Sequence, residues 1–599
     1  MRRALLAAVL LAGICVHAES GAPTAIGNVD SRTSIRLDGT WNTIIDPYET
    51  GLGSRFYENA KPKTKSDLIE YDFEHSPKLH VPGDWNTQRE SLLFYEGPIW
   101  YQRNFSYHKR PGVRTFLYFG AANYFARIWV NGQKLGEHVG GFTPFDFDAT
   151  DQVNDGDNSI VVEVDNTRHA EGVPALKTDF WNYGGLTRGV RLVEEPADFI
   201  QDYLIQLAKG KADIVEGWVQ LAAAAGSGQV SIEIPEIHLK QSTQLDASGR
   251  AIFRFQVHVE LWSPDHPKLY HVVISGGGDS VTDEIGFRTI ETRGAQILLN
   301  GKPIFLRGIS MHEEAPFRSG KAFSEDDDRT LLTWAKELGC NFVRFAHYPY
   351  NEDMLRLADQ MGLLVWEEIP VYWDIQWQNP ATLENAKSQL REIISRDRNR
   401  AAIALWSMSN ETPISVERTE FLKSLVSYAQ QLDPTRLITS AMNHTDRSGP
   451  DTRILNDPLG ESLDVLGVNE YMGWYEAKVE DTDHTQWKFA YEKPVIVSEF
   501  GAGALYNLHG DAQTRFTEEY QANVFDHQLA MWQRVPQLAG MSPWLLMDFR
   551  SPRRPLVGIQ DYFNRKGLIS DQGQRKQAFY VLQNSYKQKA KTAGERPEK

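Results

Sequence analysis

Cysteine is almost absent from this sequence, which holds two cysteines, Cys15 and Cys340, in 599 residues. Cys15 lies in an N-terminal segment that we expect to be removed, which leaves Cys340 alone. A single thiol can form no internal disulfide and provides no cysteine-based metal site. Cys340 stands between Gly339 and an apolar run, so we expect a buried, unreactive thiol there. The stability of this long chain therefore has to come from its packed core.

Long hydrophobic runs are missing after the N-terminus, which excludes later membrane-spanning helices. The first segment, MRRALLAAVLLAGICVHA, combines two arginines, an apolar core at 4–16 and a small-residue cleavage pattern that ends at Ala18. A membrane anchor would need a longer apolar run, and a lipoprotein signal on Cys15 would need a small residue in place of Ile14. We predict a signal peptide at 1–18 and an exported protein, periplasmic or secreted, with no membrane attachment after cleavage.

An excess of basic residues is absent as well. Lysine and arginine number 63 against 79 aspartates and glutamates, which gives a net charge of −16. Because nucleic-acid binders normally carry a basic patch, this balance argues against a nucleic-acid partner. It does not exclude a small anionic substrate, since a few local cations can override the overall sign. The length and the 41% hydrophobic content are typical of a folded chain of several domains.

The first half of the chain has the pattern of β structure. Short alternating runs separated by turn residues predict a jelly-roll β sandwich at 19–200 and a smaller Ig-like β sandwich at 201–292. The segment FARIWVNGQKLGEH is a predicted hairpin, in which Asn131 and Gly132 supply a two-residue turn with positive φ.

The second half, 293–590, alternates apolar strands with amphipathic helices and predicts a (β/α)8 TIM barrel. Near-continuous apolar runs are typical of parallel strands buried on both faces. One predicted helix begins after Ser324 and ends before Gly339. An open doubly wound sheet is the alternative, but the first strand is not followed by its glycine-rich phosphate loop. The eight predicted strands are 304–309, 341–346, 363–369, 402–408, 437–442, 465–471, 495–500 and 542–549.

Polar side chains follow these strands, where the loops of a barrel enzyme form its active site. Glu411, in WSMSNETP, follows the fourth strand, and Glu499, in VIVSEFGAG, ends the seventh. These strands lie on roughly opposite sides of an eight-stranded ring, so the two carboxylates can face each other across its mouth. Cleavage of a glycosidic bond needs such a pair, one as proton donor and one as nucleophile. The alternative for either glutamate is a structural ion pair, which we expect for Glu367 and Glu368.

Several motifs in the expected order carry a family resemblance. The segments EGPIWYQRNF, IWVNGQKLGEHVGGFTPF and TDFWNYGGLTRGV are similar to a sugar-binding domain, and FVRFAHYPY, WSMSNETP, VNEYMGWY and VIVSEFGAG to active-site signatures. On these motifs the chain resembles glycoside hydrolase family 2, and within it the β-glucuronidases. The resemblance covers most of the chain and implies a jelly-roll sugar-binding domain, an Ig-like domain and a catalytic barrel.

The resemblance also implies roles for individual residues. Glu411 would be the acid/base of a double displacement, and Glu499 the nucleophile that forms a covalent glycosyl-enzyme. Asn410 would bind the sugar 2-hydroxyl, and Tyr471 would orient the nucleophile. The remaining implied contacts to the sugar come from His347, Tyr475, Trp544 and, from the first domain, Asp179.

The motif FNRKGLIS implies the substrate, because its Asn564 and Lys566 match the Asn-x-Lys pattern that binds the glucuronate carboxylate in this family. An assisting arginine is not evident in FRSPRRPLVGIQDYF, where Arg550, Arg553 or Arg554 would have to serve. We take Arg550 as the candidate.

The predicted function is thus an exported retaining exo-glycosidase that hydrolyses terminal β-D-glucuronides or uronic-acid-ended oligosaccharides. A β-galactosidase or β-galacturonidase of the same family is the nearest alternative, and a non-catalytic carbohydrate-binding protein the remote one. No histidine, cysteine and carboxylate spacing indicates a metal, and retaining hydrolysis needs no cofactor. His312 stays ambiguous, and the resemblance leaves a homo-oligomer as an expectation.

Overall fold

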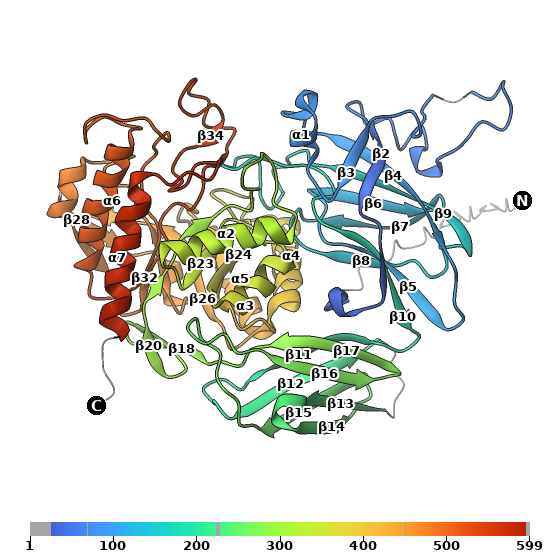
Figure 1. Cartoon of the computed structure of the whole chain (residues 1–599), viewed down its shortest axis with the longest axis horizontal. Coiled ribbons are helices and arrows are strands. Elements are labelled where there is room, and N and C mark those ends of the chain that lie inside the picture. Colours follow the sequence, from blue (N-terminus) through green and yellow to red (C-terminus); the bar gives the residue numbers. More distant parts are fainter. Residues whose placement is uncertain (1–25, 69, 223–227, 450, 595–599) are drawn as a thin grey trace, which may run out of the picture.

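The computed structural model describes residues 26–594 except 69, 223–227 and 450. Two β sandwiches and a helix-covered barrel make up the molecule (Figure 1). The signal peptide predicted at 1–18 lies outside the described residues. None of the helices in the described part of the chain has the length and apolar character that crossing a bilayer requires.

The N-terminal sandwich packs a six-stranded sheet, in the order β3-β2-β4-β9-β6-β7, against a four-stranded sheet, β1-β10-β5-β8. Its predicted hairpin is confirmed, because β6 and β7 pair around Asn131 and Gly132, which have φ of 51° and 78°. A short helix, α1 (Trp85–Gln88), precedes β4. The strands are β1 Ser34–Arg36, β2 Gly39–Ile45, β3 Lys78–Val81, β4 Pro98–Tyr107, β5 Val113–Phe119, β6 Phe125–Val130, β7 Gln133–Val139, β8 Phe145–Asp148, β9 Gly156–Asp165 and β10 Val190–Pro196.

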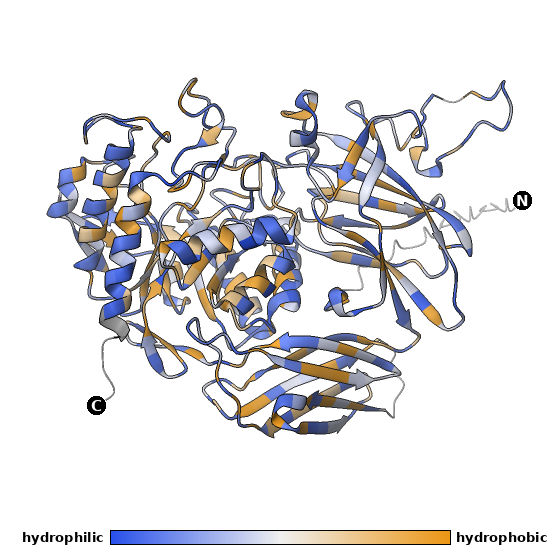
Figure 2. Cartoon of the chain, in the orientation of Figure 1, coloured by the Kyte–Doolittle hydropathy of each residue, from blue (hydrophilic) through white to orange (hydrophobic). Residues whose placement is uncertain are grey.

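The second sandwich consists of two antiparallel sheets, β11-β12-β15 and β14-β13-β16-β17. Buried and more exposed residues alternate along β12, as a strand with one face on a core requires. Figure 2 shows this alternation as orange and blue bands along these strands. The strands are β11 Ile200–Leu207, β12 Ile214–Leu221, β13 Gln229–Ile234, β14 Leu239–Gln244, β15 Arg250–Gln256, β16 Tyr270–Gly276 and β17 Asp279–Ile285.

A three-stranded sheet, β18 (Ile290–Arg293), β19 (Gln296–Leu299) and β20 (Lys302–Ile304), leads from the second sandwich into the barrel. The barrel sheet runs in the order β21-β32-β31-β29-β26-β25-β24-β23-β22, and all its pairs are parallel. Its elements are β21 Leu306–Arg307, β22 Ser310–Met311, β23 Phe342–Phe345, β24 Leu364–Glu368, β25 Ile403–Asn410, β26 Leu437–Asn443, β29 Leu466–Asn469, β31 Val495–Glu499 and β32 Leu538–Met541.

The barrel closes through its first strand. β21 and β22 are two pieces of that strand, one paired with β32 and the other with β23, so the ring has eight strand positions. The predicted fold class, jelly-roll sandwich, Ig-like sandwich and TIM barrel, is confirmed. The domain limits 19–200, 201–292 and 293–590 stay predictions.

Helices cover the outside of the barrel (Figure 1). Ser324 caps the first of them through a hydrogen bond from the backbone N–H of Asp327, and Gly339 ends it with φ of 94°, so both predicted helix limits are confirmed. The helices are α2 Glu325–Leu338, α3 Glu352–Met361, α4 Pro380–Asp397, α5 Val416–Leu432, α6 Glu518–Gln533 and α7 Gln577–Gly594.

The prediction for the eighth barrel strand was wrong. The apolar segment 542–549 was expected to form it, but the strand is β32, Leu538–Met541, which ends just before that segment. A side chain at Gly540 would place its Cβ 2.7 Å from the Cβ of Leu306, so the strand has small residues where it meets β21. Small residues make the apolar run of β32 weak in the sequence. The bulkier residues at 542–549 therefore resembled a buried strand more closely.

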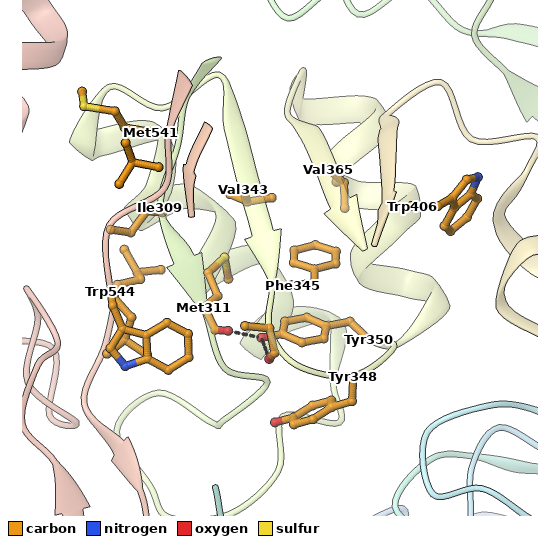
Figure 3. Close-up of a cluster of buried hydrophobic side chains, with 14 of the residues drawn as sticks. Ile309, Met311, Val343, Phe345, Tyr348, Tyr350, Val365, Trp406, Met541 and Trp544 are labelled. Carbon is orange, nitrogen blue, oxygen red and sulfur yellow. Dashed lines mark hydrogen bonds between the residues drawn. The ribbon is translucent and has the colours of Figure 1, made fainter. Parts of the chain in front are cut away.

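The barrel core is packed with side chains from the strands and the helices. Figure 3 shows part of it, with Ile309 and Met311 from the first strand facing Val343 and Phe345 from β23. The Tyr350 hydroxyl donates a hydrogen bond to the backbone oxygen of Met311 and thereby ties the loop after β23 to the first strand. The same core reaches Trp544, which also lines the mouth of the barrel.

We expect Gly540→Ala to destabilise the barrel, because the added methyl group would overlap Leu306 at the seam that closes the ring. Overpacking of this kind costs about 1–3 kcal/mol. Thermal unfolding of the purified protein should show a lower midpoint for this variant. Gly53→Ala is the matched control, since its added Cβ would meet only the Thr50 carbonyl, at 3.5 Å. Equal midpoints for the two variants would contradict the expectation.

Candidate active site

A cavity of about 500 Å³ opens where the barrel strands end. Side chains from the N-terminal sandwich and from the loops after β23, β24, β25, β26, β29, β31 and β32 meet in it. Eight of the predicted site residues line this cavity: Asp179, His347, Glu411, Tyr471, Tyr475, Glu499, Trp544 and Lys566. Asn410, Arg550 and Asn564 do not line it.

Glu411 directly follows β25 and has a left-handed backbone, with φ of 51°. This conformation is strained for a residue with a side chain and persists only where the surroundings impose it. Here the Glu411 N–H donates to the carbonyl of Ala441 at 2.9 Å. Its carboxyl group accepts hydrogen bonds from Trp373 Nε1 at 2.9 Å and Asn469 Nδ2 at 3.1 Å. The backbone turn and these two donors hold the carboxyl group at the cavity.

The protonation of Glu411 suits a proton donor. Burial raises the pKa of its carboxyl group, and the charge of Glu499 raises it further. The hydrogen bonds from Trp373 and Asn469 favour the carboxylate and oppose this rise. The balance leaves the pKa above its ordinary value, so the group keeps its proton to higher pH than a free glutamate does.

Glu499 ends β31, and each of its carboxylate oxygens accepts a hydrogen bond. Arg344 Nη1 donates to Oε1 at 2.7 Å, and the Tyr471 hydroxyl donates to Oε2 at 2.7 Å. Burial and the charge of Glu499 hold the pKa of Tyr471 well above its ordinary value, so its hydroxyl stays a donor. The carboxyl group of Glu499 is therefore held in position from two sides.

Arg344 connects the nucleophile candidate to the rest of the floor of the site. This fully buried guanidinium also donates to Glu368 Oε1 at 2.8 Å and to Asn410 Oδ1 at 2.8 Å. Asn410 Oδ1 accepts a second bond from Asn469 at 3.2 Å. Asn410 Nδ2, in contrast, has no hydrogen-bond partner in the described part of the chain. The Asn410 amide is thus oriented through its oxygen, and neither N–H of its Nδ2 has a partner among the described residues.

His347 and Trp544 form one wall of the cavity. Their rings stack with centroids 4.9 Å apart, and His347 Nε2 lies 4.0 Å from Glu499 Oε1. His347 Nδ1 lies 2.9 Å from Glu368 Oε1. Burial alone would raise the pKa of Glu368, but Arg344 and His347 lower it to about 2. Glu368 is therefore a charged anchor for an arginine and a histidine, as the sequence analysis expected.

Glu367 and His312 do not line the cavity, and their contacts are with buried neighbours. Glu367 lies 3.3 Å from Arg396, but burial and the neighbouring Asp397 raise the pKa of its carboxyl group well above the ordinary value. His312 has its Nδ1 3.2 Å from the Tyr348 hydroxyl and stacks on Phe549 at 4.0 Å. Burial holds the pKa of His312 well below its ordinary value, so it is neutral. Cys340 is buried, as expected, and burial raises the pKa of its thiol.

The opposite side of the cavity carries positive charge. Lys566 is 3% exposed, and its Nζ donates to the Tyr475 hydroxyl at 2.6 Å. The ammonium also lies 4.8 Å from the ring centre of Tyr471. No carboxylate of the described residues comes within 4.0 Å of it, whereas most buried cations of a folded protein are paired. Asn564 Oδ1 accepts a hydrogen bond from the backbone N–H of Lys566 at 3.2 Å.

Asp179 reaches the barrel mouth from the N-terminal sandwich, as predicted. It pairs with Arg554, accepts a bond from the Ser551 hydroxyl at 2.5 Å and lies 3.4 Å from Asn564 Nδ2. Arg554 also donates to the Tyr475 hydroxyl at 3.0 Å. Burial would raise the pKa of that hydroxyl, but Lys566 and Arg554 together lower it.

Arg550 is not at the cavity, so the choice among the three candidate arginines is corrected. Arg550 pairs with Phe563 in the small hairpin of β33 (Phe549–Arg550) and β34 (Phe563–Asn564). Its guanidinium donates to Ser319 at 3.1 Å. Arg553 and Arg554 lie in the loop of that hairpin and line the cavity. The sequence pattern did not reveal that β33 and β34 pair. This pairing keeps Arg550 away from the cavity and places Arg553 and Arg554 in the loop that lines it.

Sequence reasoning missed two contributors to the site, Arg344 and Trp373. Arg344 could have been found, because a charge inside the apolar run FVRFA requires a partner. Nothing in the sequence indicated Trp373, since its place beside Glu411 depends on how the loop after β24 folds back over the mouth. Asn469 is one of the polar residues expected at the ends of the strands, and its hydrogen bond to Glu411 gives it a role there.

One cluster at the cavity has spacing suited to a metal ion. The ligand atoms of His444, Glu470 and Glu476 lie within 4.8 Å of one another. Arginines balance one of the two carboxylates, because Arg447 pairs with Glu476 and Arg453 Nε lies 3.9 Å from it. Glu470 Oε2 lies 3.4 Å from His444 Nδ1.

Comparisons with known proteins agree with this architecture. Family models of the glycosyl hydrolases family 2 match three successive parts of the chain: the sugar binding domain at 35–196, a second domain at 200–288 and the TIM barrel domain at 290–590. A relative named "Beta-glucuronidase" from Canis lupus familiaris is 30% identical, and the alignment covers 94% of this chain and 92% of the relative.

Solved structures are similar over nearly the whole chain. A β-glucuronidase from an uncultured Clostridium sp. has a TM-score of 0.80 at 27% identity, covering 93% of this chain and 98% of that one. A GH2 β-galacturonidase from Eisenbergiella tayi has a TM-score of 0.77 at 25% identity, covering 93% and 96%. The barrel model alone spans more than half of the sequence. The chain is an O-glycosyl hydrolase and belongs to family 2 of the glycosyl hydrolases.

Proposed function

We propose that this protein is a retaining exo-β-glucuronidase that releases terminal β-D-glucuronic acid. The substrate assignment rests on Lys566, which is buried at the cavity and has no carboxylate partner among the described residues. A carboxylate on the bound sugar would supply that partner and form charge-assisted hydrogen bonds with it. The names of the relatives, β-glucuronidases in the dog and in a Clostridium, support the same substrate.

The proposed reaction uses Glu411 and Glu499 in turn. Glu411, whose raised pKa favours the protonated form, donates its proton to the glycosidic oxygen as that C–O bond breaks. Glu499, held by Arg344 and Tyr471, attacks the anomeric carbon and forms a glycosyl ester. The Glu411 carboxylate then takes a proton from water, whose oxygen attacks the same carbon and releases Glu499. Two inversions give net retention.

The surroundings fit these roles. Asn410 does not line the cavity, but its amide oxygen accepts a hydrogen bond from Arg344, which also holds Glu499. The stacked His347 and Trp544 offer a flat wall for the ring. A neutral hexose would leave Lys566 unpaired, and a site built around a buried charge discriminates against a ligand that lacks its partner. Export through a signal peptide at 1–18, to the periplasm or the medium, is part of the proposal and rests on the sequence pattern alone.

A β-galacturonidase is the second candidate, favoured by the similarity to the Eisenbergiella tayi enzyme. Galacturonate differs from glucuronate only at C4, so Lys566 would bind the carboxylate of either sugar. Assays of aryl β-glucuronide, β-galacturonide and β-galactoside side by side separate the candidates. We expect the glucuronide to have the highest kcat/KM.

We expect Glu499→Gln to abolish turnover of an aryl β-glucuronide, because an amide cannot serve as the nucleophile. Glu411→Gln should lower kcat about 100- to 10,000-fold, the usual contribution of a general acid. The wild-type protein should release the β anomer first, which proton NMR of the early product detects. The α anomer as first product would contradict double displacement.

Lys566→Ala should lower kcat/KM for an aryl β-glucuronide roughly 10- to 150-fold, since a hydrogen bond to a charged group contributes about 1.5–3 kcal/mol. The corresponding β-glucoside, which lacks the carboxylate, should lose nothing by the change. Lys488→Ala, at an exposed position of β30 (Gln486–Phe489), is the control. Glucuronide turnover unchanged in Lys566→Ala would exclude the substrate assignment.

Trp373→Phe should move the alkaline limb of the kcat/KM profile to higher pH. The Trp373 N–H stabilises the charged form of Glu411, so its loss raises the pKa of that carboxyl group further. Glu411 acts while protonated, and activity falls as pH rises through its pKa. Trp377→Phe is the matched control, because that indole donates to Asp374 outside the cavity. A limb that stays in place would argue against Glu411 as the acid.

A further inference from the structure

Arg553 lies at the cavity on the side of the proton donor. Its guanidinium carbon is 4.6 Å from the ring centre of Trp373, and the Trp373 indole donates to Glu411 at 2.9 Å. Arg553 and Trp373 both line the cavity. The arginine is thus placed against the acid/base candidate through a single aromatic ring.

Lys566 has the corresponding position on the side of the nucleophile. It lies 4.8 Å from the ring of Tyr471, whose hydroxyl donates to Glu499. In the proposed reaction Glu499 attacks the sugar, whereas Glu411 protonates the oxygen of the leaving group. The two cations therefore face different parts of the substrate, Lys566 the released sugar and Arg553 the leaving group.

Arg553 is free to bind an anion. No carboxylate of the described residues lies within 4.0 Å of its guanidinium, although the neighbouring Arg554 is paired with Asp179. Arg553 is exposed, and its backbone N–H donates to the Ser551 hydroxyl at 3.2 Å. Ser551 is buried and also donates to Asp179, so the backbone at Arg553 is anchored while its charge remains open to the solvent.

The chemistry of this position favours a carboxylate or a sulfate ester. A guanidinium that stacks on an indole keeps its N–H groups directed along its edge, where they match two oxygens of a planar or tetrahedral anion. The chain as a whole carries a net charge of −16, which repels anions, so a local cation has a large influence on which ones enter. The cavity of about 500 Å³ has room for groups beyond a single sugar ring.

We infer that Arg553 selects substrates whose leaving group carries an anion next to the scissile bond, as in an acidic oligosaccharide with a uronate or sulfated sugar in second position. This inference rests on the proposed function. It assigns a specificity role at the leaving-group side to a residue that touches neither catalytic glutamate.

The test compares leaving groups in the full-length protein. Three aryl β-glucuronides are used, identical except that the aryl ring carries a carboxylate, a sulfate ester or the methyl ester of the carboxylate. The measured quantity is the ratio of kcat/KM for each charged substrate to kcat/KM for the methyl ester. We expect the ratio in the wild-type protein to exceed one and to fall with added salt, since screening weakens an exposed ion pair.

Arg553→Gln should lower this ratio roughly two- to fivefold, mainly through KM, because solvent screens an exposed ion pair. Arg553→Lys should retain part of the ratio. The carboxylate and sulfate arms show which anion the position prefers. Arg250→Gln is the matched control, because Arg250 stacks on Trp218 at 4.2 Å in the second sandwich, away from the cavity. It should leave the ratio unchanged.

The outcomes separate the two proposals. If the wild-type protein hydrolyses the glucuronides and Arg553→Gln has the same ratio, the inference about Arg553 is overturned and the proposed function stands. If the wild-type protein hydrolyses no glucuronide, the proposed function fails, and the inference fails with it. A drop in the ratio in Arg250→Gln as large as in Arg553→Gln would also overturn it, because the effect would then come from overall charge.

Discussion

The active site depends on one buried cation. Arg344 is fully enclosed in the barrel and donates to Glu499, Glu368 and Asn410. Without it, the buried carboxyl groups of Glu499 and Glu368 would lose the guanidinium that they share, and breaking a buried ion pair in this way typically costs about 3–5 kcal/mol. Because a guanidinium offers five N–H groups in one plane, a single side chain can set the positions of a nucleophile, a supporting carboxylate and an amide at once. Strand β23 carries this arginine, so the barrel that buries it also aligns the site.

The two glutamates at the cavity differ through their surroundings. Glu499 receives a hydrogen bond on each oxygen, one from the Arg344 guanidinium and one from the Tyr471 hydroxyl. Burial and the nearby charge of Glu499 raise the pKa of Glu411, and the hydrogen bonds from Trp373 and Asn469 only partly oppose this rise. Two residues of the same type thereby become suited to opposite tasks, one to attack and one to give up a proton. Each glutamate also has a cation nearby across an aromatic ring. Lys566 lies over the ring of Tyr471 beside Glu499, and Arg553 lies over the ring of Trp373 beside Glu411.

Much of the fold was predictable because it follows from local rules. The Asn131–Gly132 turn, the Ser324 cap and the Gly339 stop are interactions between near neighbours in the chain, and the structure confirms them. Apolar runs located seven of the eight barrel strands. The eighth was misplaced, because Gly540 is required by contact with Leu306, more than two hundred positions away in the sequence. A requirement of that kind leaves no pattern among adjacent residues.

The sequence by itself determined the classes of the three units, the pair Glu411 and Glu499, and the lysine of the Asn-x-Lys motif, since each depends on a strand end or a short motif. Only the tertiary structure decided which of the arginines face the cavity, that Asp179 pairs with Arg554 there, and that Trp373 covers Glu411. These choices depend on how loops from separate strands fold over a common mouth. Residues that meet there are far apart in the chain, and no local pattern records which of them turn inward.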